Sequence, residues 1–388
     1  MEVNQIISLL PDNLLSELAV DTNVNKYAKK LQAELLFKLL LHSILSYKDN
    51  SLRTMASAYE STGFALLNAG KKSDHIVHSS ISERLSTIDP SYFERLYLKA
   101  IETYSSLFLA KADSLIRFDS TIVALSGKLL KVGYNLHGGD AEHLRQLKFT
   151  IGFAQLPVTV HLFTDQSHTS ENVALKEAIL ALELGNREKI RVFDRGITAR
   201  KTYDEFTERN IPFISRININ SKKSTVTDNV ILAPIEIDTL IIHSDSWVYL
   251  FSEKRKSNHP VRCIESTRRE TGENITFVTN IKDLNPDDIA SLYKRRWDIE
   301  VFFKFLKQEL NFAHLINRSE NGIRIMLYCT LIASTLLLVY KETNKLKGYK
   351  IMKQRFVDSL EKYLLKDFVA MCGGDPNLVD LRIKSPPS

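Results

Sequence analysis

Cysteine, glycine and proline are scarce in this sequence. Its 388 residues include three cysteines, Cys263, Cys329 and Cys372, which lie far apart and form no CxxC pair. This spacing argues against a disulfide framework or a structural zinc site and favours a reducing cytosol. The 14 glycines and 10 prolines are too few for a fibrous or disordered chain, and 44% hydrophobic residues suffice for a sizeable core.

Long apolar runs are also missing. The longest, Ile325 to Tyr340, is interrupted by Thr330, Ser334 and Thr335. It is shorter than the roughly 20 residues that a membrane span needs, so it predicts a buried helix and no membrane partner. The N-terminus lacks the basic segment and the cleavage site of a signal peptide. The net charge of +6 permits a nucleic-acid partner without demanding one.

The pattern along the chain predicts an α/β protein with several parts. Helical patterns fill residues 1–110, and short runs rich in β-branched and aromatic residues begin near Ser114. These runs then alternate with helical stretches, which indicates a mixed sheet with flanking helices. The predicted parts are a helical N-terminal region (1–110), a core (111–211 and 282–345), a strand-rich insertion (212–281) and a helical tail (346–388).

Two aspartates are expected at the ends of core strands. Asp119 follows the run SLIRF, and Asp194 follows the run KIRVF. Ligands of open α/β sheets bind at the carboxyl ends of strands, so both carboxylates are candidate site residues. Each of them, taken alone, is also compatible with a turn or a helix N-cap.

A helix predicted from Asn285 to Leu310 carries an unusual polar stripe. At about 100° per residue its members fit within an arc of roughly 80°. These members are Tyr293, Arg296, Glu300, Lys304 and Lys307. One interpretation is a solvated face with ion pairs such as Glu300 with Lys304. The other is a set of cations that hold phosphate oxygens beside a metal-binding carboxylate.

The spacing of Tyr293, Arg296, Glu300 and Lys307 resembles the Y-(2)-R-(3)-E-(6)-K signature of a family of bacterial insertion-sequence transposases of the DDE type. The surrounding segment LYKRRWDIEVFFKFLKQEL, which includes Trp297, is similar to that family as well. The resemblance implies a ribonuclease-H-like core with a β-rich insertion. The N-terminal segments SLRTMASAYE and HSSISERL resemble, more weakly, the region with which the family binds the ends of its DNA.

RFDST around Asp119 and VFDRG around Asp194 match the first and second catalytic aspartates of that family. The resemblance therefore implies that Asp119, Asp194 and Glu300 are catalytic and hold two Mg²⁺ ions, for which Mn²⁺ can substitute. Asp119 would bridge the two ions. Carboxylates suit this task because Mg²⁺ prefers oxygen ligands. Two such ions can stabilise both the attacking and the leaving oxygen of an in-line displacement at phosphorus.

The implied activity is cut-and-paste transposition at the inverted ends of the chain's own insertion sequence. The implied partners are double-stranded DNA, as transposon ends and as target, and a second copy of the chain in the DNA complex, in the cytoplasm beside the bacterial nucleoid. The expected DNA contacts are Tyr293, Arg296, Trp297, Lys304, Lys307 and the basic run Lys254, Arg255 and Lys256.

Alternatives remain at this point. The basic run is also typical of an exposed loop, and Trp297 is equally compatible with a structural role. A ribonuclease-H-like nuclease or resolvase without strand transfer would use the same carboxylates, and a catalytically dead DNA-binding derivative is a third possibility. Trp247 does not lie where the resemblance would put a base-stacking aromatic residue, so a hairpin intermediate stays undecided.

Overall fold

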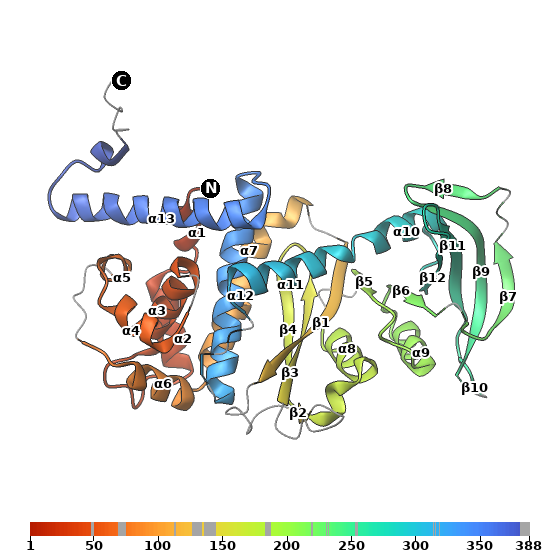
Figure 1. Ribbon diagram of the computed structural model, residues 1–388, viewed down its shortest axis with the longest axis horizontal. Coiled ribbons are helices and arrows are strands. Elements are labelled where there is room, and N and C mark those ends of the chain that lie inside the picture. Colours follow the sequence, from red (N-terminus) through yellow and green to blue (C-terminus); the bar gives the residue numbers. More distant parts are fainter. Residues whose placement is uncertain are drawn as a thin grey trace. The chain divides into compact units, whose positions relative to one another are not determined.

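The structure is a computed structural model and divides into two compact units, Met1–Ala110 with Lys304–Ser388, and Lys111–Phe303 (Figure 1). The residues that it describes are 1–47, 50–68, 75–111, 114–125, 134–135, 145–182, 188–218, 220–229, 231, 233–252, 255–312, 314, 316–317 and 319–380.

The first unit is helical. Its elements are α1 (Val3–Ile7), α2 (Asp12–Asp21), α3 (Ala33–Ser46), α4 (Leu52–Tyr59), α5 (Thr62–Leu67), α6 (His78–Thr87), α7 (Ser91–Ser105), α12 (Glu320–Thr343) and α13 (Tyr349–Met371), with 3₁₀ turns at Ser106–Lys111 and Pro376–Asp380. Helix α12 begins where the Ser319 hydroxyl accepts a hydrogen bond from the Gly322 N–H.

Helix α12 is long and apolar enough to cross a membrane, but 94% of its most apolar stretch is buried inside the protein. It packs against α3, α6, α7 and α13 of the same unit. An apolar helix surrounded by other helices is the centre of a bundle. The prediction of a buried helix over Ile325 to Tyr340 is confirmed.

The second unit is built on one mixed sheet. Its strands are β1 (Leu115–Leu125), β2 (Tyr134–Asn135), β3 (Arg145–Phe153), β4 (Pro157–Phe163), β5 (Ile190–Phe193), β6 (Phe213–Ile217), β7 (Lys223–Asn229), β8 (Ile235–Ile237), β9 (Leu240–Ser252), β10 (Arg255–Lys256), β11 (Val261–Arg268) and β12 (Asn274–Thr279). Their order is β10-β9-β11-β12-β6-β5-β1-β3-β2, with β4 beside β3, and with β7 and β8 beside β9.

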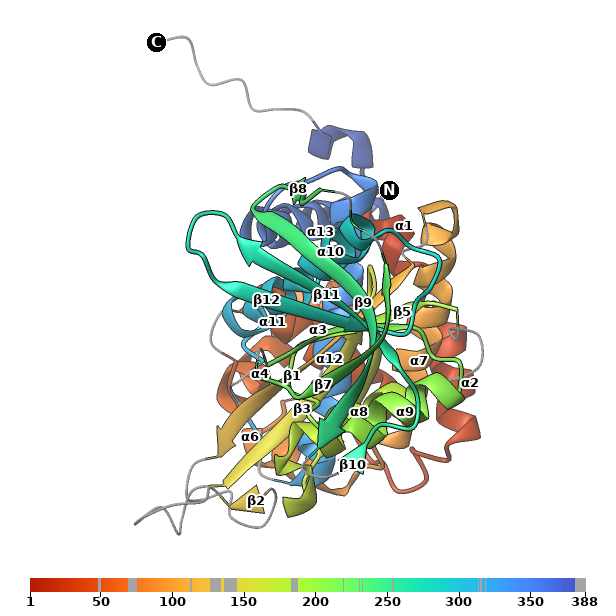
Figure 2. The ribbon, with the colours of Figure 1, turned by 90° about the vertical axis from the view of Figure 1, so that its right-hand side faces the viewer.

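The sheet is parallel only at its centre, where β5 pairs with β1 on one side and with β6 on the other. Strand β6 also pairs antiparallel with β12, so the strand-rich segment after β6 continues the core sheet. Figure 2 shows β12, β11 and β9 of this segment side by side. The predicted class, a ribonuclease-H-like mixed sheet with flanking helices and a helical N-terminal region, is confirmed.

Helices cover both faces of the sheet centre. On one face, Phe118 and Phe193 belong to the core that includes α8 (Glu171–Leu180) and α9 (Arg200–Glu208). On the other face, Leu115 and Val192 pack with residues of α10 (Pro286–Lys294). Successive side chains of a strand point to opposite faces. Odd-numbered residues of β1 and even-numbered residues at the end of β5 therefore face α10.

The helix predicted from Asn285 to Leu310 is two helices in the structure, so that prediction was wrong in one respect. Helix α10 ends at Lys294, and α11 spans Trp297–Glu309. Around Arg295 and Arg296 each backbone N–H donates to the carbonyl three residues earlier, as in a 3₁₀ turn; the Arg296 N–H, for example, donates to the Tyr293 carbonyl at 2.8 Å. Such tighter winding rotates the side chains that follow it relative to a continuous α-helix.

Asp119 also differs from expectation, because it lies within β1 and not at its end. The parallel pairing of β1 with β5 stops at Phe118 opposite Phe193. The antiparallel pairing with β3 continues to Leu125 opposite Arg145 and prolongs the strand. Asp119 is therefore the first residue beyond the parallel part of β1.

Candidate active site

Asp119 and Asp194 lie side by side at the centre of the sheet. Each directly follows a member of the last parallel pair, Phe118 opposite Phe193. By the alternation of side chains along each strand, both carboxylates point to the face of the sheet that α10 covers. The sheet register thus places two carboxylates next to each other at the carboxyl end of β5, where α/β folds place ligands.

Asp194 is held by a tyrosine and an arginine. Its Oδ1 accepts a hydrogen bond from the Tyr293 hydroxyl at 3.0 Å and bonds from Arg216 Nη2 at 3.0 Å and Nε at 3.3 Å. Burial raises the pKa of Asp194, but the Arg195 N–H bond and the charges of Arg216 and Arg296 outweigh it, so the pKa is lowered overall. Asp194 therefore stays ionised at neutral pH.

Asp119 has the opposite balance. Burial raises its pKa to about 6, although the Ser120 N–H donates to Oδ1 at 2.8 Å and the Arg296 charge opposes the rise. The negative charges of Glu171 and Glu300 add to the increase. Asp119 is thus a carboxylate whose anionic form is poorly compensated by the chain itself, and a bound cation would favour that form.

Arg296 connects the helix to all three carboxylates. Its Nη2 donates to Glu300 Oε1, one helical turn further on, and its charge acts on Asp119 and Asp194. The residue is only 9% exposed, and its Nε has no hydrogen-bond partner among the described residues. The guanidinium carbon lies 5.9 Å from the Tyr293 ring centroid. Tyr293 and Arg296, predicted to bind DNA phosphates, thus lie turned toward the carboxylates.

Sequence reasoning missed two residues of this site. Arg216 lies in β6, where the sequence pattern indicates a strand and assigns no role to the arginine. Glu171, at the start of α8, accepts from the Ser120 hydroxyl at 3.1 Å and from the buried Lys148 ammonium at 2.9 Å. An arginine at every second position of a strand and an acidic residue in the first turn of a helix are both common in proteins. Neither residue could therefore be identified from the sequence as part of a functional site.

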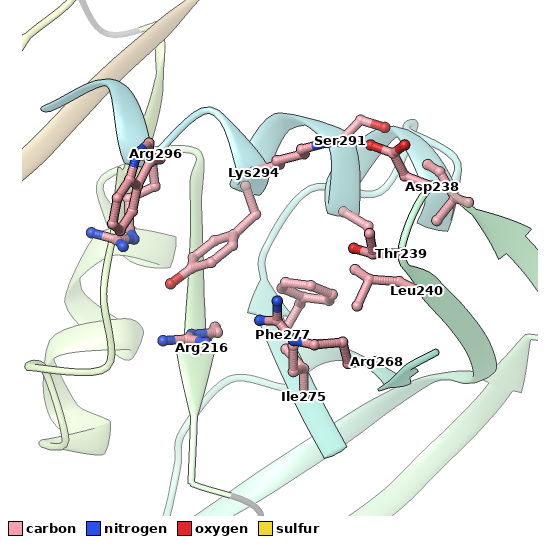
Figure 3. Close-up of a pocket in the computed structure, with 14 residues that line it drawn as sticks. Arg216, Asp238, Thr239, Leu240, Arg268, Ile275, Phe277, Ser291, Lys294 and Arg296 are labelled. Atoms are coloured by element: carbon pink, nitrogen blue, oxygen red, sulfur yellow. Dashed lines mark hydrogen bonds and ion pairs between the residues drawn. The ribbon is translucent and has the colours of Figure 1, made fainter. Parts of the chain in front are cut away.

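A cavity of about 400 Å³ lies between α10 and the strand-rich segment, and its lining includes Arg216, Tyr293 and Arg296, the partners of Asp194 and Glu300. Arg216 and Arg296 lie at one end of it, and Asp238, Thr239 and Leu240 lie at the other (Figure 3). Its remaining lining combines apolar and aromatic side chains with two more cations: Ile237, Arg268, Ile275, Phe277, Ala290, Ser291, Tyr293, Lys294 and Trp297. A cationic cavity with aromatic walls suits a segment of nucleic acid.

The other predicted DNA contacts are distributed over the chain. Trp297, 61% exposed, opens α11 and lines this cavity, whereas Lys304 and Lys307 are exposed residues of α11 that belong to the helical unit. Arg255 and Lys256 form β10 and are exposed. Lys254 lies outside the described residues.

The basic pair on β10 is remote from the cavity. Leu240, at the start of β9, lines the cavity, whereas β10 pairs with Ser252 and Phe251 at the other end of β9. The length of β9 separates the two places by roughly 40 Å. Lys256 Nζ lies 3.5 Å from the centroid of the Tyr249 ring.

The donor set fits a hard divalent cation. Among the described residues, no group of three or more His, Cys, Asp or Glu side chains is close enough to hold a metal ion by itself. Asp119 Oδ2 and Glu300 Oε2 nevertheless accept no hydrogen bond from that part of the chain. Mg²⁺ usually binds one or two carboxylates and completes its shell with waters and substrate phosphates, so it does not require a closed protein cage.

Comparison with known proteins agrees with this arrangement. Residues 111–336 match the protein family described as Transposase DDE domain. A protein of Geobacillus stearothermophilus, named as a transposase for insertion sequence element IS5377, is 29% identical over 42% of each chain. A Sinorhizobium fredii protein named as transposase y4zB is 30% identical over 40% of this chain and 43% of its own.

A third relative, from Synechocystis and named as a transposase for insertion sequence element IS4SA, is 26% identical over 56% of this chain and 58% of its own length. The chain thus spans about half the length of the relatives that it matches.

Proposed function

Because the chain belongs to the transposase DDE domain family, we propose that it cuts DNA at the inverted ends of its own insertion sequence and joins those ends to a target DNA. The observation that carries the proposal is the pair Asp119 and Asp194, neighbours at the end of parallel strands, with Arg296 linking them electrostatically to Glu300. Proteins of this family generally depend on a divalent metal, and we propose Mg²⁺.

Asp119, Asp194 and Glu300 would hold two Mg²⁺ ions, and Mn²⁺ would substitute for them. When bound, such ions activate the attacking oxygen and stabilise the leaving oxygen of a phosphodiester. The carboxylates supply oxygen donors of the kind that these cations prefer. That Asp194 remains ionised, through its bonds with Arg216 and Tyr293, supports this assignment.

The surrounding side chains would orient these groups. Tyr293 and Arg216 fix one oxygen of Asp194, and Arg296 fixes one oxygen of Glu300. Hydrogen bonds of this kind limit the rotation of a ligating carboxylate before the substrate arrives. The buried Arg296 Nε, which has no partner among the described residues, is a donor suited to a phosphate oxygen of the DNA strand.

DNA would contact several parts of the protein. The cavity lined by Arg216, Lys294 and Trp297 would receive the strand next to the cut, while Arg255 and Lys256, with Lys254, would contact the backbone further away. Lys304 and Lys307 would contribute further phosphate contacts.

We also propose that residues 1–110 bind the transposon end and that residues 212–281 act as the β-rich insertion of a core at 111–211 and 282–345, followed by the tail 346–388. The acting form would be a homodimer on DNA, in the cytoplasm beside the nucleoid.

The test uses purified full-length protein, Mg²⁺ and labelled duplexes that carry the inverted repeats flanking the reading frame. The proposal predicts cuts at the repeat ends and covalent joining of the 3′ ends to a target plasmid. Cutting without joining would indicate a nuclease or resolvase. Specific binding without cutting, in Mg²⁺ and in Mn²⁺, would indicate a DNA-binding derivative.

A further inference from the structure

Arg117 is a buried cation in the strand that carries Asp119. It is 1% exposed and precedes Asp119 by two residues, so it shares the strand face of that carboxylate. Its Nε donates to the Arg295 carbonyl at 2.9 Å, its Nη1 donates to the Ala154 carbonyl at 3.2 Å, and its Nη2 lies 3.1 Å from Asp298 Oδ2. One side chain thus bonds to the end of β3 and to the turn between α10 and α11.

That turn determines where the signature residues point. Tyr293 lies before it, Arg296 lies within it, and Glu300 lies in the first turn of α11. The Arg295 carbonyl accepts the Asp298 N–H at 3.1 Å and the Arg117 Nε, and Ile299 N–H bonds to the Arg296 carbonyl at 3.2 Å. The tight winding of this segment is therefore coupled to a contact with β1.

A lysine could not make the same set of contacts. The guanidinium group is planar and donates in several fixed directions at once, whereas an ammonium group on a flexible stem is a point charge. Arg117 uses this geometry to reach two carbonyls and one carboxylate on separate segments. Arg117→Lys would keep the charge and lose the simultaneous connection.

We infer that Arg117 is a positioning residue: by fixing the turn between α10 and α11, it holds Arg296 and Glu300 in position next to Asp119 and Asp194. The inference rests on the proposed function, because it assigns those carboxylates to metal binding and cleavage. Arg117 acts through the turn and not on the DNA. Its loss should therefore lower the metal affinity and the rate of cutting, whereas end binding, which uses many contacts besides Arg296, should change much less.

The fold should survive the change, because α11 has a second attachment to the sheet. The Phe302 ring stacks on the Phe153 ring of β3, with centroids 4.5 Å apart and planes at 17°. Apolar contacts of this size hold a helix on a sheet without the arginine. Arg117→Lys then releases the turn and leaves the helix attached.

Arg262 offers a matched control. It is 5% exposed, bonds to the buried Asp245 at 2.8 and 2.6 Å, and donates to the Leu284 carbonyl at 2.6 Å. Arg262→Lys is therefore a comparable change at a buried arginine of the same unit. It should lower the melting temperature without altering Mn²⁺ affinity or the cutting rate at temperatures where the protein is folded.

The experiment measures Mn²⁺ binding by electron paramagnetic resonance, and cleavage at saturating labelled DNA, for full-length wild type, Arg117→Lys and Arg262→Lys. The inference predicts that Arg117→Lys weakens Mn²⁺ binding or slows cutting by about 10- to 100-fold, the range seen when partners of metal ligands are removed. The DNA concentration for half-maximal rate should change less than about threefold.

Asp298→Asn provides a second variant if Arg117→Lys does not fold. Its side chain is half exposed, and the change removes its ion pairs with Arg117 and Arg295 while leaving both carbonyl bonds of Arg117. We expect this variant to lose about threefold or more in Mn²⁺ affinity or cutting rate, which is a smaller loss than that of Arg117→Lys. Wild-type Mn²⁺ affinity and rate in the folded Arg117→Lys protein, or in Asp298→Asn if only that variant folds, would overturn the inference. Wild-type protein that binds Mn²⁺ but never cuts would overturn the proposed function instead, and the Mn²⁺ comparison would still decide the role of Arg117.

Discussion

Tyr293→Phe separates two roles for the signature tyrosine. The sequence pattern predicts that its hydroxyl binds a DNA phosphate, whereas in the structure that hydroxyl donates to Asp194 Oδ1 at 3.0 Å. The substitution removes only the hydroxyl. The ring, 8% exposed, keeps its place against Phe277, whose centroid is 5.2 Å away. The variant should therefore fold like the wild type.

The size of the effect follows from the surroundings of Asp194. A hydrogen bond to a charged group contributes about 1.5–3 kcal/mol. The Asp194 side chain is 38% exposed and keeps its bonds to Arg216, so the lower end of that range applies. A loss of about 1.5 kcal/mol corresponds to a roughly 10-fold slower cut. Removing the donor also raises the pKa of Asp194, because the donor favours the ionised form.

The assay compares single-turnover cutting at saturating DNA with end binding measured by gel shift. We expect a slower cut, a higher Mg²⁺ requirement and unchanged end binding. Tyr293→Ala, which also removes the ring, should in addition lower stability. Weaker end binding together with a wild-type rate at saturating DNA would refute this reasoning and return the hydroxyl to a DNA phosphate.

Two further predictions concern other parts of the chain. Arg255→Ala with Lys256→Ala should weaken DNA binding and reduce the slope of log K against log salt by about 0.9 for each lost phosphate contact; an unchanged slope would make β10 a solvated edge. Burial lowers the pKa of His42 below its ordinary value, so the unfolded chain binds the proton first and the free energy of unfolding should fall as the pH drops below about 6.5. Urea titrations at pH 7.5 and 5.5 check this, and His42→Asn should show less of the fall; an identical fall in both proteins would contradict it.

The location of the site was predictable from the sequence to a useful degree. The runs SLIRF and KIRVF predict strands, and a carboxylate after each of them predicts a site at the carboxyl ends of these strands. The structure adds the register, Phe118 opposite Phe193, which makes Asp119 and Asp194 neighbours. The class of the sheet followed from the same patterns, because strand and helix periodicities are local properties of the chain.

The break between α10 and α11 was not predictable in that way. The segment from Tyr293 to Trp297 contains no glycine or proline, so local propensity favours a continuous helix. The tight turn depends on Arg117, which lies 178 residues before Arg295 and bonds to its carbonyl. The bond of Arg216 to Asp194 likewise depends on which strands become neighbours. Contacts between distant segments have no local periodicity, and therefore they emerge only from the fold.

The central claim is that Asp119, Asp194 and Glu300 act together as the metal-binding carboxylates of DNA cleavage. The most direct measurement is strand-mapped cutting of a labelled inverted-repeat duplex in Mg²⁺ by wild type, Asp119→Asn, Asp194→Asn and Glu300→Gln, with end binding followed in parallel. A neutral amide is a poor ligand for Mg²⁺, so each variant should lose cutting while it still binds the end. Cutting at near the wild-type rate by any one of the three would contradict the account, because that residue could not then be a required ligand.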